Sequence, residues 1–200
     1  MSLKNSFALC LIFLVFYGCA KKVSVNLSKD GKFVLEQVTL VNPTICDYSK
    51  KGIFYYEDRF NKVKFKGYLK KDCDNNFYLA VLGGFNQQVM EIKGSPLGIE
   101  VISSQLENTE DYVRLFTKEN IGNILRIMNY PYIRPDESFE FKPVGDTYMF
   151  FKDGVEISVD RKFRIRNIKA GFSEILYGYE DELVKIELKD ISMKMSVTFF

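Results

Sequence analysis

The residues of this chain that could do covalent chemistry are its four cysteines, Cys10, Cys19, Cys46 and Cys73. A thiol can carry an acyl chain or pair in a disulfide. The 200 residues contain no histidine, which excludes Ser-His-Asp and Cys-His catalysis, histidine-ligated zinc and histidine pH switching. The chemistry of this chain is therefore expected to lie in what its cysteines attach or join.

The acidic residues do not form a convincing catalytic pair. Asp72 and Asp74, like Glu180 and Asp181, lie in predicted turns, where carboxylates are solvated and do not flank a glycosidic bond. Gly83-Gly84 is too short to cradle a phosphate. We expect no enzymatic activity, no cofactor and no metal.

The composition is that of a foldable chain with no polyanionic partner. It has 28 Lys and Arg against 26 Asp and Glu, a net charge of +2, which gives no reason to expect nucleic acid binding. Apolar residues make up 46% of the chain, with 18 Phe and 12 Tyr but no Trp. These aromatic residues must fill a large core or line a cavity.

An apolar run of eleven residues, 7–17, precedes Gly18-Cys19. It is too short to span a bilayer but has the length of a signal-peptide core. A small residue directly before this cysteine resembles the bacterial lipobox, which implies cleavage after Gly18 and acylation of Cys19. Each buried methylene would contribute roughly 0.8 kcal/mol, so two or more acyl chains would anchor the protein stably. The alternative is an ordinary secretory signal with a chance cysteine.

Two cysteines of the exported chain can form a single pairing. The pattern predicts a hairpin of strands 51–57 and 61–70 with Arg59 and Phe60 at its centre. Cys46 and Cys73 are equally far from that centre, so they are expected to face each other. A disulfide there would contribute roughly 3 to 4 kcal/mol; the alternative is two free thiols.

The rest of the chain predicts one domain, mainly β (α+β). Residues 1–18 form the signal peptide, 19–33 a lipidated N-terminus and tether, and 34–200 the domain. Apolar residues alternate with polar ones, as in half-buried antiparallel strands. We expect a single curved antiparallel sheet of about ten or eleven strands, an incomplete barrel covered by one or two helices. The strands are expected over 51–57, 61–70, 77–82, 87–93, 98–103, 147–152, 155–160, 162–169, 174–179, 183–189 and 193–199.

One segment has the periodicity of a helix. Between Thr117 and Met128, apolar residues recur at i, i+3, i+4 and i+7. Thr117 can cap its start, and Pro131 stops it soon after Asn129. A second, weaker helix is predicted within 33–44. A helix over a large sheet would act as a lid on its open side.

The order of these elements is similar to the LolB family, within the LolA/LolB-like superfamily of incomplete eleven-stranded barrels. The resemblance covers residues 51–200 and is densest in Gly52-x-Phe54-x-Tyr56, Phe77-x-Leu79 and Leu82-Gly83-Gly84-Phe85. It departs from the family in having no tryptophan, and Phe85 stands where the family has a membrane-inserting leucine.

The resemblance implies a lipoprotein receptor anchored in the outer membrane and facing the periplasm. Ala20 fits that destination, because the family sorting rule retains lipoproteins with aspartate there in the inner membrane. The implied partners are membrane lipid through acylated Cys19, the acyl chains of client lipoproteins and a LolA-like periplasmic carrier, with the receptor a monomer. The loop Gly83-Gly84-Phe85 would enter the membrane. The alternative function is a lipid-anchored protein-interaction module with a solid core and no lipid cavity.

A receptor of this kind needs a dry apolar cavity. Inward residues of the curved sheet and the apolar stripe of the helix are the candidates to line it, although each alone could equally fill a packed core. The sheet would contribute Phe65, Phe77, Leu79, Val81, Ile99, Val101, Ile165 and Ile186, and the helix Ile121, Ile124, Leu125 and Met128.

A row of lysines alternates with the apolar residues of the second strand. Lys62, Lys64, Lys66 and Lys70 share its polar face. They could meet anionic headgroups or an acidic carrier. The alternative is a solvated face that guards the strand against unwanted pairing.

Overall fold

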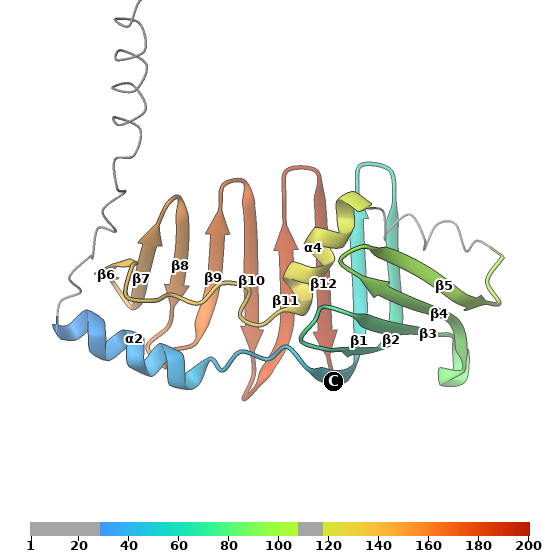
Figure 1. Ribbon diagram of the computed structural model, residues 1–200, viewed down its shortest axis with the longest axis horizontal. Coiled ribbons are helices and arrows are strands. Elements are labelled where there is room, and N and C mark those ends of the chain that lie inside the picture. The colour runs from blue at the N-terminus through green and yellow to red at the C-terminus, as the bar shows by residue number, and fades with distance from the viewer. Residues whose placement is uncertain (1–28, 108–117) are drawn as a thin grey trace, which may run out of the picture.

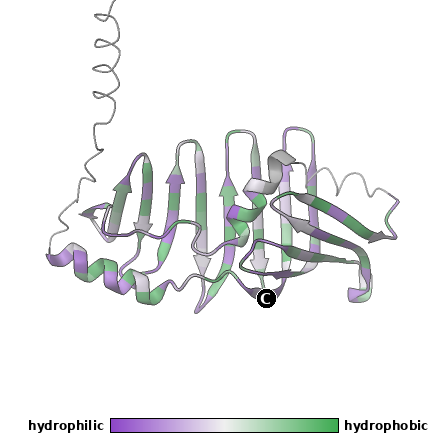
Figure 2. Ribbon diagram, viewed as in Figure 1, coloured by the Kyte–Doolittle hydropathy of each residue, from purple (hydrophilic) through white to green (hydrophobic). Residues whose placement is uncertain are grey.

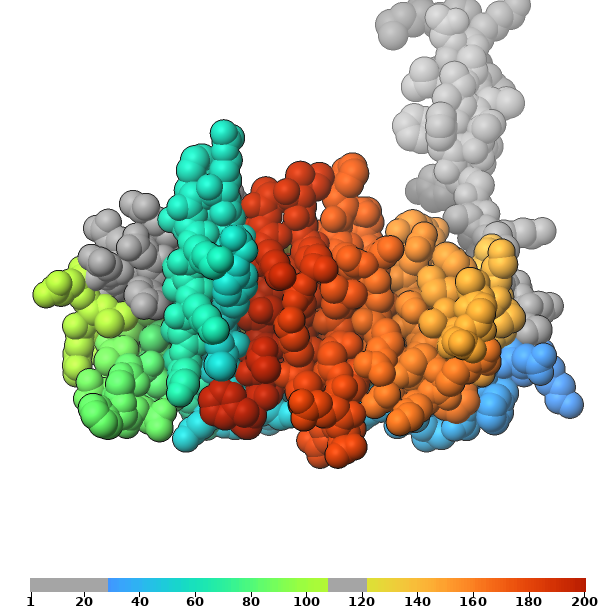
Figure 3. Space-filling view, turned by 180° about the vertical axis from the view of Figure 1, so that it is seen from behind, coloured from blue at the N-terminus to red at the C-terminus, as the bar shows by residue number. Residues whose placement is uncertain are grey.

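The computed structural model describes residues 29–107 and 118–200, which form an open antiparallel sheet of twelve strands with two helices (Figure 1). The sheet does not close into a barrel, because its order β5-β4-β3-β2-β1-β12-β11-β10-β9-β8-β7-β6 leaves β5 and β6 as edges. The first strand in sequence, β1, pairs with the last, β12, and Figure 3 shows the cyan β1–β2 hairpin beside the red C-terminal strands from behind. The predicted fold class is confirmed.

The bounds of the elements are as follows. The helices are α2 (Lys29–Val41) and α4 (Lys118–Met128), with a short 3₁₀ turn, η1 (Gly84–Asn86). The strands are β1 (Tyr48–Asp58), β2 (Lys62–Lys71), β3 (Phe77–Leu82), β4 (Gln88–Ser95), β5 (Gly98–Ser104), β6 (Glu140–Val144), β7 (Thr147–Lys152), β8 (Val155–Val159), β9 (Ile165–Ala170), β10 (Ser173–Tyr179), β11 (Leu183–Lys189) and β12 (Met193–Phe199).

The strand that the sequence did not predict is β6. It has five residues and contains Pro143, which cannot donate a ladder hydrogen bond. It lies at the edge of the sheet and pairs only with β7, which is where a proline is tolerated. A short strand with a proline gives little alternation to recognise.

Hydrophobic and hydrophilic residues alternate along several strands (Figure 2), because successive side chains of a strand point to opposite faces of the sheet. In β12, Met193, Met195, Val197 and Phe199 are buried, and the residues between them are less so. The same inward face continues across the sheet through β11, β10, β9 and β8, where isoleucines predominate. One continuous apolar face therefore lines the concave side.

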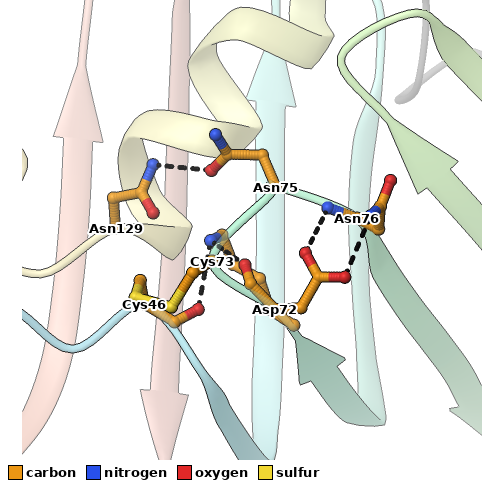
Figure 4. The surroundings of a disulfide bond; sticks show 7 residues. Cys46, Asp72, Cys73, Asn75, Asn76 and Asn129 are labelled. Carbon is orange, nitrogen blue, oxygen red and sulfur yellow. Dashed lines mark hydrogen bonds between the residues drawn. A yellow bond between two sulfur atoms is a disulfide. The ribbon is translucent and has the colours of Figure 1, made fainter.

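The β1–β2 hairpin has the predicted turn. Glu57 pairs with Lys62 and Tyr48 with Lys71, so Arg59 and Phe60 lie at its centre. At the open end of the hairpin, Cys46 and Cys73 form a disulfide with their Cα atoms 4.7 Å apart (Figure 4). This is the pair expected from their symmetric positions.

Lys71, the last residue of β2, is buried beside this disulfide. Only 1% of it is exposed, and its Nζ donates to the carbonyl oxygens of Cys46 (3.2 Å) and Asp72 (2.8 Å). Burial lowers the pKa of the Lys71 ammonium group. The two carbonyls hold the segment that leads into β1 against the end of β2.

Helix α2 begins earlier than the sequence predicts. Residues 29–33 of the expected tether are helical, and Val34, Leu35 and Val38 are buried against the sheet. In Figure 1 the helix runs along the lower ends of the strands around β8 and β9. The predicted signal peptide and acylation site, including Gly18 and Cys19, lie outside the described residues.

Helix α4 crosses the concave face over β11, β12 and β1 (Figure 1). Ile124, Ile127 and Met128 are its buried residues in the described part. The helix ends at Met128, as predicted from Pro131. Thr117, expected to cap its start, lies outside the described residues.

Candidate functional site

A small apolar cavity lies between α4 and the concave face of the sheet. Its volume is about 60 Å³. The strands β1, β2, β3 and β12 form its floor, and α4 forms its roof. The side chains and backbone that line it belong to Phe54, Tyr55, Tyr56, Phe65, Leu69, Leu79, Ile124, Ile127, Met128, Met195, Ser196 and Val197.

Strand register brings these floor residues together. Phe54 lies opposite Phe65 on one side and Val197 on the other, and Leu69 lies opposite Leu79. The rings of Phe54 and Phe65 stack with centroids 5.2 Å apart and planes 10° from parallel. The floor is therefore built from two cross-strand rows, one through β2, β1 and β12 and one that joins β2 to β3.

Gly67 makes room within this floor. A Cβ atom there would lie 3.0 Å from Cδ1 of Leu79 and 3.1 Å from the ring of Phe54. Both contacts are tighter than ordinary van der Waals contact, so any side chain would press into the cavity floor. Because Gly67 has no side chain, the side chains of Leu79 and Phe54 can pack directly against its backbone.

The roof helix is held chiefly at its C-terminal end. The hydroxyl of Tyr48 donates to the carbonyl oxygen of Met128 (2.8 Å), and Nδ2 of Asn129 donates to Oδ1 of Asn75 (3.1 Å; Figure 4). Burial raises the pKa of Tyr48 well above its usual range, so its hydroxyl remains a donor. The end of α4 is thereby fixed to β1 and to the turn before β3.

The middle of α4 has weaker polar contacts. Arg126 donates to Oγ of Ser173 over 3.3 Å, and Nδ2 of Asn123 lies 3.7 Å from the sulfur of Met193. The middle of α4 is otherwise attached to the sheet by apolar side chains that pack over the cavity. The polar contacts described for α4 are thus strongest at its C-terminal end, and apolar packing attaches the middle of the helix.

The cavity is too small for a long ligand while α4 is seated. Ligand pockets commonly have volumes of about 300 to 1,000 Å³. A volume of about 60 Å³ admits only a few water molecules. Its lining provides dispersion contacts and hardly any polar groups, so it can take an apolar chain and only after α4 has moved.

The structure brings four of the twelve predicted cavity residues into this site. Phe65, Leu79, Ile124 and Met128 line it. Val81 is buried one step further along β3, and Val101 and Leu125 are half-buried. The side chain of Ile121 lies outside the described part of the chain.

The remaining predicted residues lie elsewhere. Phe77 and Ile99 line a separate open hollow of about 620 Å³ at the ends of β2 to β5, whose lining also includes lysines and acidic residues. Ile186 lines a small gap of about 20 Å³ below the end of α4. Ile165 is fully buried in the packed core, and its amide hydrogen-bonds to Asn42.

Sequence reasoning missed six residues whose side chains belong to the inward face of this site. They are Phe54, Tyr56, Leu69, Ile127, Met195 and Val197. Alternation marked most of them as inward residues of strands. What it could not give was the pairing of β1 with β12, which makes residues more than a hundred positions apart neighbours.

The loop expected to enter a membrane forms η1. Phe85 at its centre is fully exposed, with a relative exposure of 105%, and its φ of 57° lies in the left-handed region. That backbone conformation is unfavourable for an aromatic residue and recurs at functional sites. Gly83 is required before it, since a Cβ there would lie 2.7 Å from the side chain of Val89.

The lysine row lies on the convex face. Lys62 is 3.7 Å from Glu57, an exposed pair of little energetic consequence. Lys64, Lys66 and Lys70 are exposed on the same strand. The row is solvated in this structure, and Lys62 lies over the ring of Tyr55, 5.7 Å from its centroid.

A buried carboxylate lies on the same face, in β11. Glu187 is 9% exposed and accepts contacts from Lys185 (2.7 Å), Lys194 (3.3 Å) and Lys189 (3.4 Å). Burial alone would raise its pKa, but the ammonium groups of Lys185 and Lys194 outweigh burial and lower the pKa to about 2. This cluster ties β11 to β12 behind the cavity floor.

Within residues 29–107 and 118–200 no group of three or more acidic or cysteine side chains could hold a metal ion. Neither described helix is long and apolar enough to cross a membrane.

Comparisons with known proteins give structural similarities alone. No protein-family model matches the chain, and no curated protein does. The chain is similar to a LolA superfamily protein from Nitrosomonas europaea, with a TM-score of 0.47 and 8% identity over 84% of this chain and 90% of that one.

Two further solved structures are similar. One is a putative outer membrane lipoprotein-sorting protein domain from Vibrio parahaemolyticus, with a TM-score of 0.46 and 7% identity over 86% of this chain and 90% of that one. The other is a DUF1329 family protein from Desulfovibrio piger, with a TM-score of 0.28 and 13% identity over the same shares.

Proposed function

We propose that this protein binds the acyl chains of lipoproteins beneath α4 and releases them at the membrane to which Cys19 anchors it. The observation that carries the proposal is the apolar cavity roofed by a helix fixed at one end. The sequence resemblance to the LolB family supports the same function. An outer-membrane location facing the periplasm and a LolA-like carrier as donor belong to this proposal.

The energetics favour long acyl chains. Lifting Ile124, Ile127 and Met128 off the floor would cost roughly 1.5 to 3 kcal/mol for each side chain. A chain that buries about ten methylenes would return about 8 kcal/mol at roughly 0.8 kcal/mol each. Short acyl chains therefore cannot displace the helix, whereas the chains of a lipoprotein can.

Photo-crosslinking from adjacent residues of β2 tests the proposal. Phe65 lines the cavity, and Lys64 points to the opposite face. With a photoreactive amino acid in place of Phe65, we expect covalent adducts to lipoproteins that carry radioactive fatty acid. The same amino acid at Lys64 is the matched control and should give none.

The alternative is a protein-interaction module with a solid core. The small cavity volume is the observation that favours it. In that case the photoreactive residue at position 65 would label only the protein itself, and adducts would come from surface positions. Equal labelling of lipoproteins from positions 64 and 65 would also contradict the proposal, because contact would then not depend on the cavity.

Anchoring and delivery can be tested separately. Radioactive fatty acid should label the wild-type protein and not Cys19→Ser; an unlabelled wild type would remove the anchor from the proposal. Phe85→Glu should leave folding and uptake intact, because the side chain is exposed, but slow release so that loaded protein accumulates. Unfolding of Phe85→Glu, or normal release, would exclude the delivery role.

A further inference from the structure

Three exposed apolar side chains occupy hairpin turns at one end of the strands. We call such a row of turns an edge; it is distinct from the edge strands β5 and β6. Phe60 in the β1–β2 turn is 83% exposed, Phe172 in the β9–β10 turn 82%, and Ile191 in the β11–β12 turn 74%. In Figure 1 these three tips and that of β7–β8 form a row along the upper edge. Neighbouring hairpins are two strand spacings apart, about 9 to 10 Å, so the side chains are separate and do not form one patch.

The polar groups at these tips already have partners inside the protein. Asp58 accepts from the hydroxyl of Tyr56 and the amides of Phe60 and Asn61, all at 2.7 Å. The Tyr56 hydroxyl, with the two amides, lowers the pKa of Asp58 to about 2, so this carboxylate is held in its charged, hydrogen-bonded form.

The next tip is arranged in the same way. Asp190 accepts from Oγ of Ser173 (2.5 Å) and from the amide of Ile191 (2.6 Å). The Ser173 contact also joins the β9–β10 hairpin to the β11–β12 hairpin. Both aspartates accept hydrogen bonds from within the protein. Moving these tips from water into a less polar medium would therefore leave fewer polar groups without a hydrogen-bond partner.

The opposite edge of the sheet has a different character. Its β2–β3 turn carries Asp72 and Asp74, and its β10–β11 turn carries residues 180–182, all acidic. The β8–β9 turn on that edge is the basic exception. An anionic surface would repel most of this edge more strongly than the edge with Phe60, Phe172 and Ile191, whose turns carry Asp58, Asp153 and Asp190 with Arg59 as a counter-charge.

We propose that the edge formed by Phe60, Phe172 and Ile191 contacts the lipid bilayer. Separate apolar side chains suit a fluid lipid interface, whereas a protein interface needs a contiguous buried core. The inference rests on the proposed anchor: from Cys19 to Lys29, where α2 begins, the chain can span at most about 35 Å. The bilayer is thus within reach of the domain at all times.

This edge is distinct from the Phe85 loop. The curl of the sheet turns β3 and β4 away from the upright hairpins, so η1 points in another direction in Figure 1. The edge would orient the domain on the membrane and would not be needed for loading or release.

Vesicle flotation of the full-length exported protein with Cys19→Ser tests the proposal without the acyl anchor. With vesicles of phosphatidylethanolamine and phosphatidylglycerol, each of Phe60→Ser, Phe172→Ser and Ile191→Ser should lower the partition coefficient about fivefold, and the triple variant about a hundredfold. Leu97→Ser is the matched control, because Leu97 is 89% exposed but lies in the β4–β5 turn, outside the row of tips with Phe60, Phe172 and Ile191. Melting temperatures should not change.

A triple variant that partitions within twofold of its parent would overturn the proposal, as would an equal loss from Leu97→Ser. If only Phe85→Ser reduced partitioning, membrane contact would belong to η1. Crosslinking of lipoproteins from position 65 reports on the proposed function independently. If crosslinking from position 65 gave no lipoprotein adducts while the triple variant lost its vesicle binding, the protein would dock on membranes but have another activity.

Discussion

Helices α2 and α4 pack on the same sheet but are attached to it in different ways. Asn42, the residue after α2, is fully buried, and its side chain uses every hydrogen-bonding position it has. Its Nδ2 donates to the carbonyl oxygens of Val38 and Phe163, both at 2.7 Å. Its Oδ1 accepts from the hydroxyl of Tyr130 (2.7 Å) and the amide of Ile165 (3.0 Å).

No side chain of α4 in the described part is attached in this way. Its polar contacts are longer and partly exposed, apart from the bond that Tyr48 donates to the carbonyl of Met128. Below α4 there is a cavity, whereas the end of the sheet near α2 is filled by rings: Tyr148 stacks on Phe163, and Phe33 of α2 packs edge-on against it.

The two helices therefore differ in role: α2 is fixed to the sheet by a buried hydrogen-bond network, whereas α4 covers a cavity and is attached mainly by apolar packing. A buried, fully satisfied polar side chain fixes one arrangement, because every displacement leaves unpartnered groups. Apolar packing over a gap tolerates displacement, since an apolar ligand can replace the contacts. Tyr130 joins the two, because it follows α4 and its hydroxyl donates to Oδ1 of Asn42, the residue after α2.

The largest effect is expected from Asn42→Ala. The change leaves the Tyr130 hydroxyl and the Phe163 and Ile165 backbone groups buried without this partner, at about 1 to 3 kcal/mol each. We expect chemical denaturation to show a loss of about 4 to 6 kcal/mol. The control Thr39→Ala, at an exposed position of α2, should cost less than about 1 kcal/mol. If Asn42→Ala lowered the free energy of unfolding as little as Thr39→Ala does, α2 would be no more firmly attached to the sheet than α4.

Removing the disulfide tests whether the side of the sheet near α4 is stabilised independently of the side near α2. The bond closes a loop with a sequence separation of 27. Replacing both Cys46 and Cys73 by serine should lower the free energy of unfolding by about 3 to 4 kcal/mol. Hydrogen exchange should then be faster in β1 to β3 than in β8 to β10. Uniform acceleration would show that the two sides unfold as one unit.

Acid should weaken the sheet that both helices share. Glu187 has a pKa of about 2 in the folded protein against an ordinary value of 4.5, so it contributes stability above pH 4.5 that is lost as the pH falls towards 2. The loss is about 3 kcal/mol at most. Denaturation curves recorded over this range should lose that dependence in Glu187→Gln. If the variant keeps it, other carboxylates are responsible.

The smallest effect on stability, and the most informative one for the cover, is expected from Asn129→Ala. It removes the bond to Asn75 at the end of α4, which is partly exposed, so it should cost about 1 kcal/mol or less. Amide exchange should nevertheless become several-fold faster in α4 and stay unchanged in α2. Unchanged exchange in α4 would place its fixed end at Tyr48 and Tyr130 alone.

Local patterns in the sequence are sufficient to predict most of this fold. Period-two alternation locates eleven strands, and the spacing of Ile124, Leu125 and Met128 locates the part of α4 that packs on the sheet. The β1–β2 turn follows from the strand pattern, and the pairing of Cys46 with Cys73 follows from that turn. In each case the signal lies within a few dozen residues.

What could not be predicted depends on contacts between distant segments. The cavity needs Met195 and Val197 beside Phe54, and nothing near Phe54 specifies that β12 is its neighbour. Asn42 looks like an ordinary residue before Pro43, and its burial follows from packing against residues more than 120 positions away. The same is true of Ile165, whose alternation is that of a cavity residue although it lies in the packed core.

The two edge strands have a consequence for how copies of this protein behave together. An unclosed sheet presents unpaired backbone groups at both ends, and these can recruit another chain and grow into filaments. β6 is short and contains Pro143, and β5 carries Glu100 and an irregular register with β4. Such edges pair poorly, so the sheet can stay open without polymerising, even when many copies of the protein are crowded together.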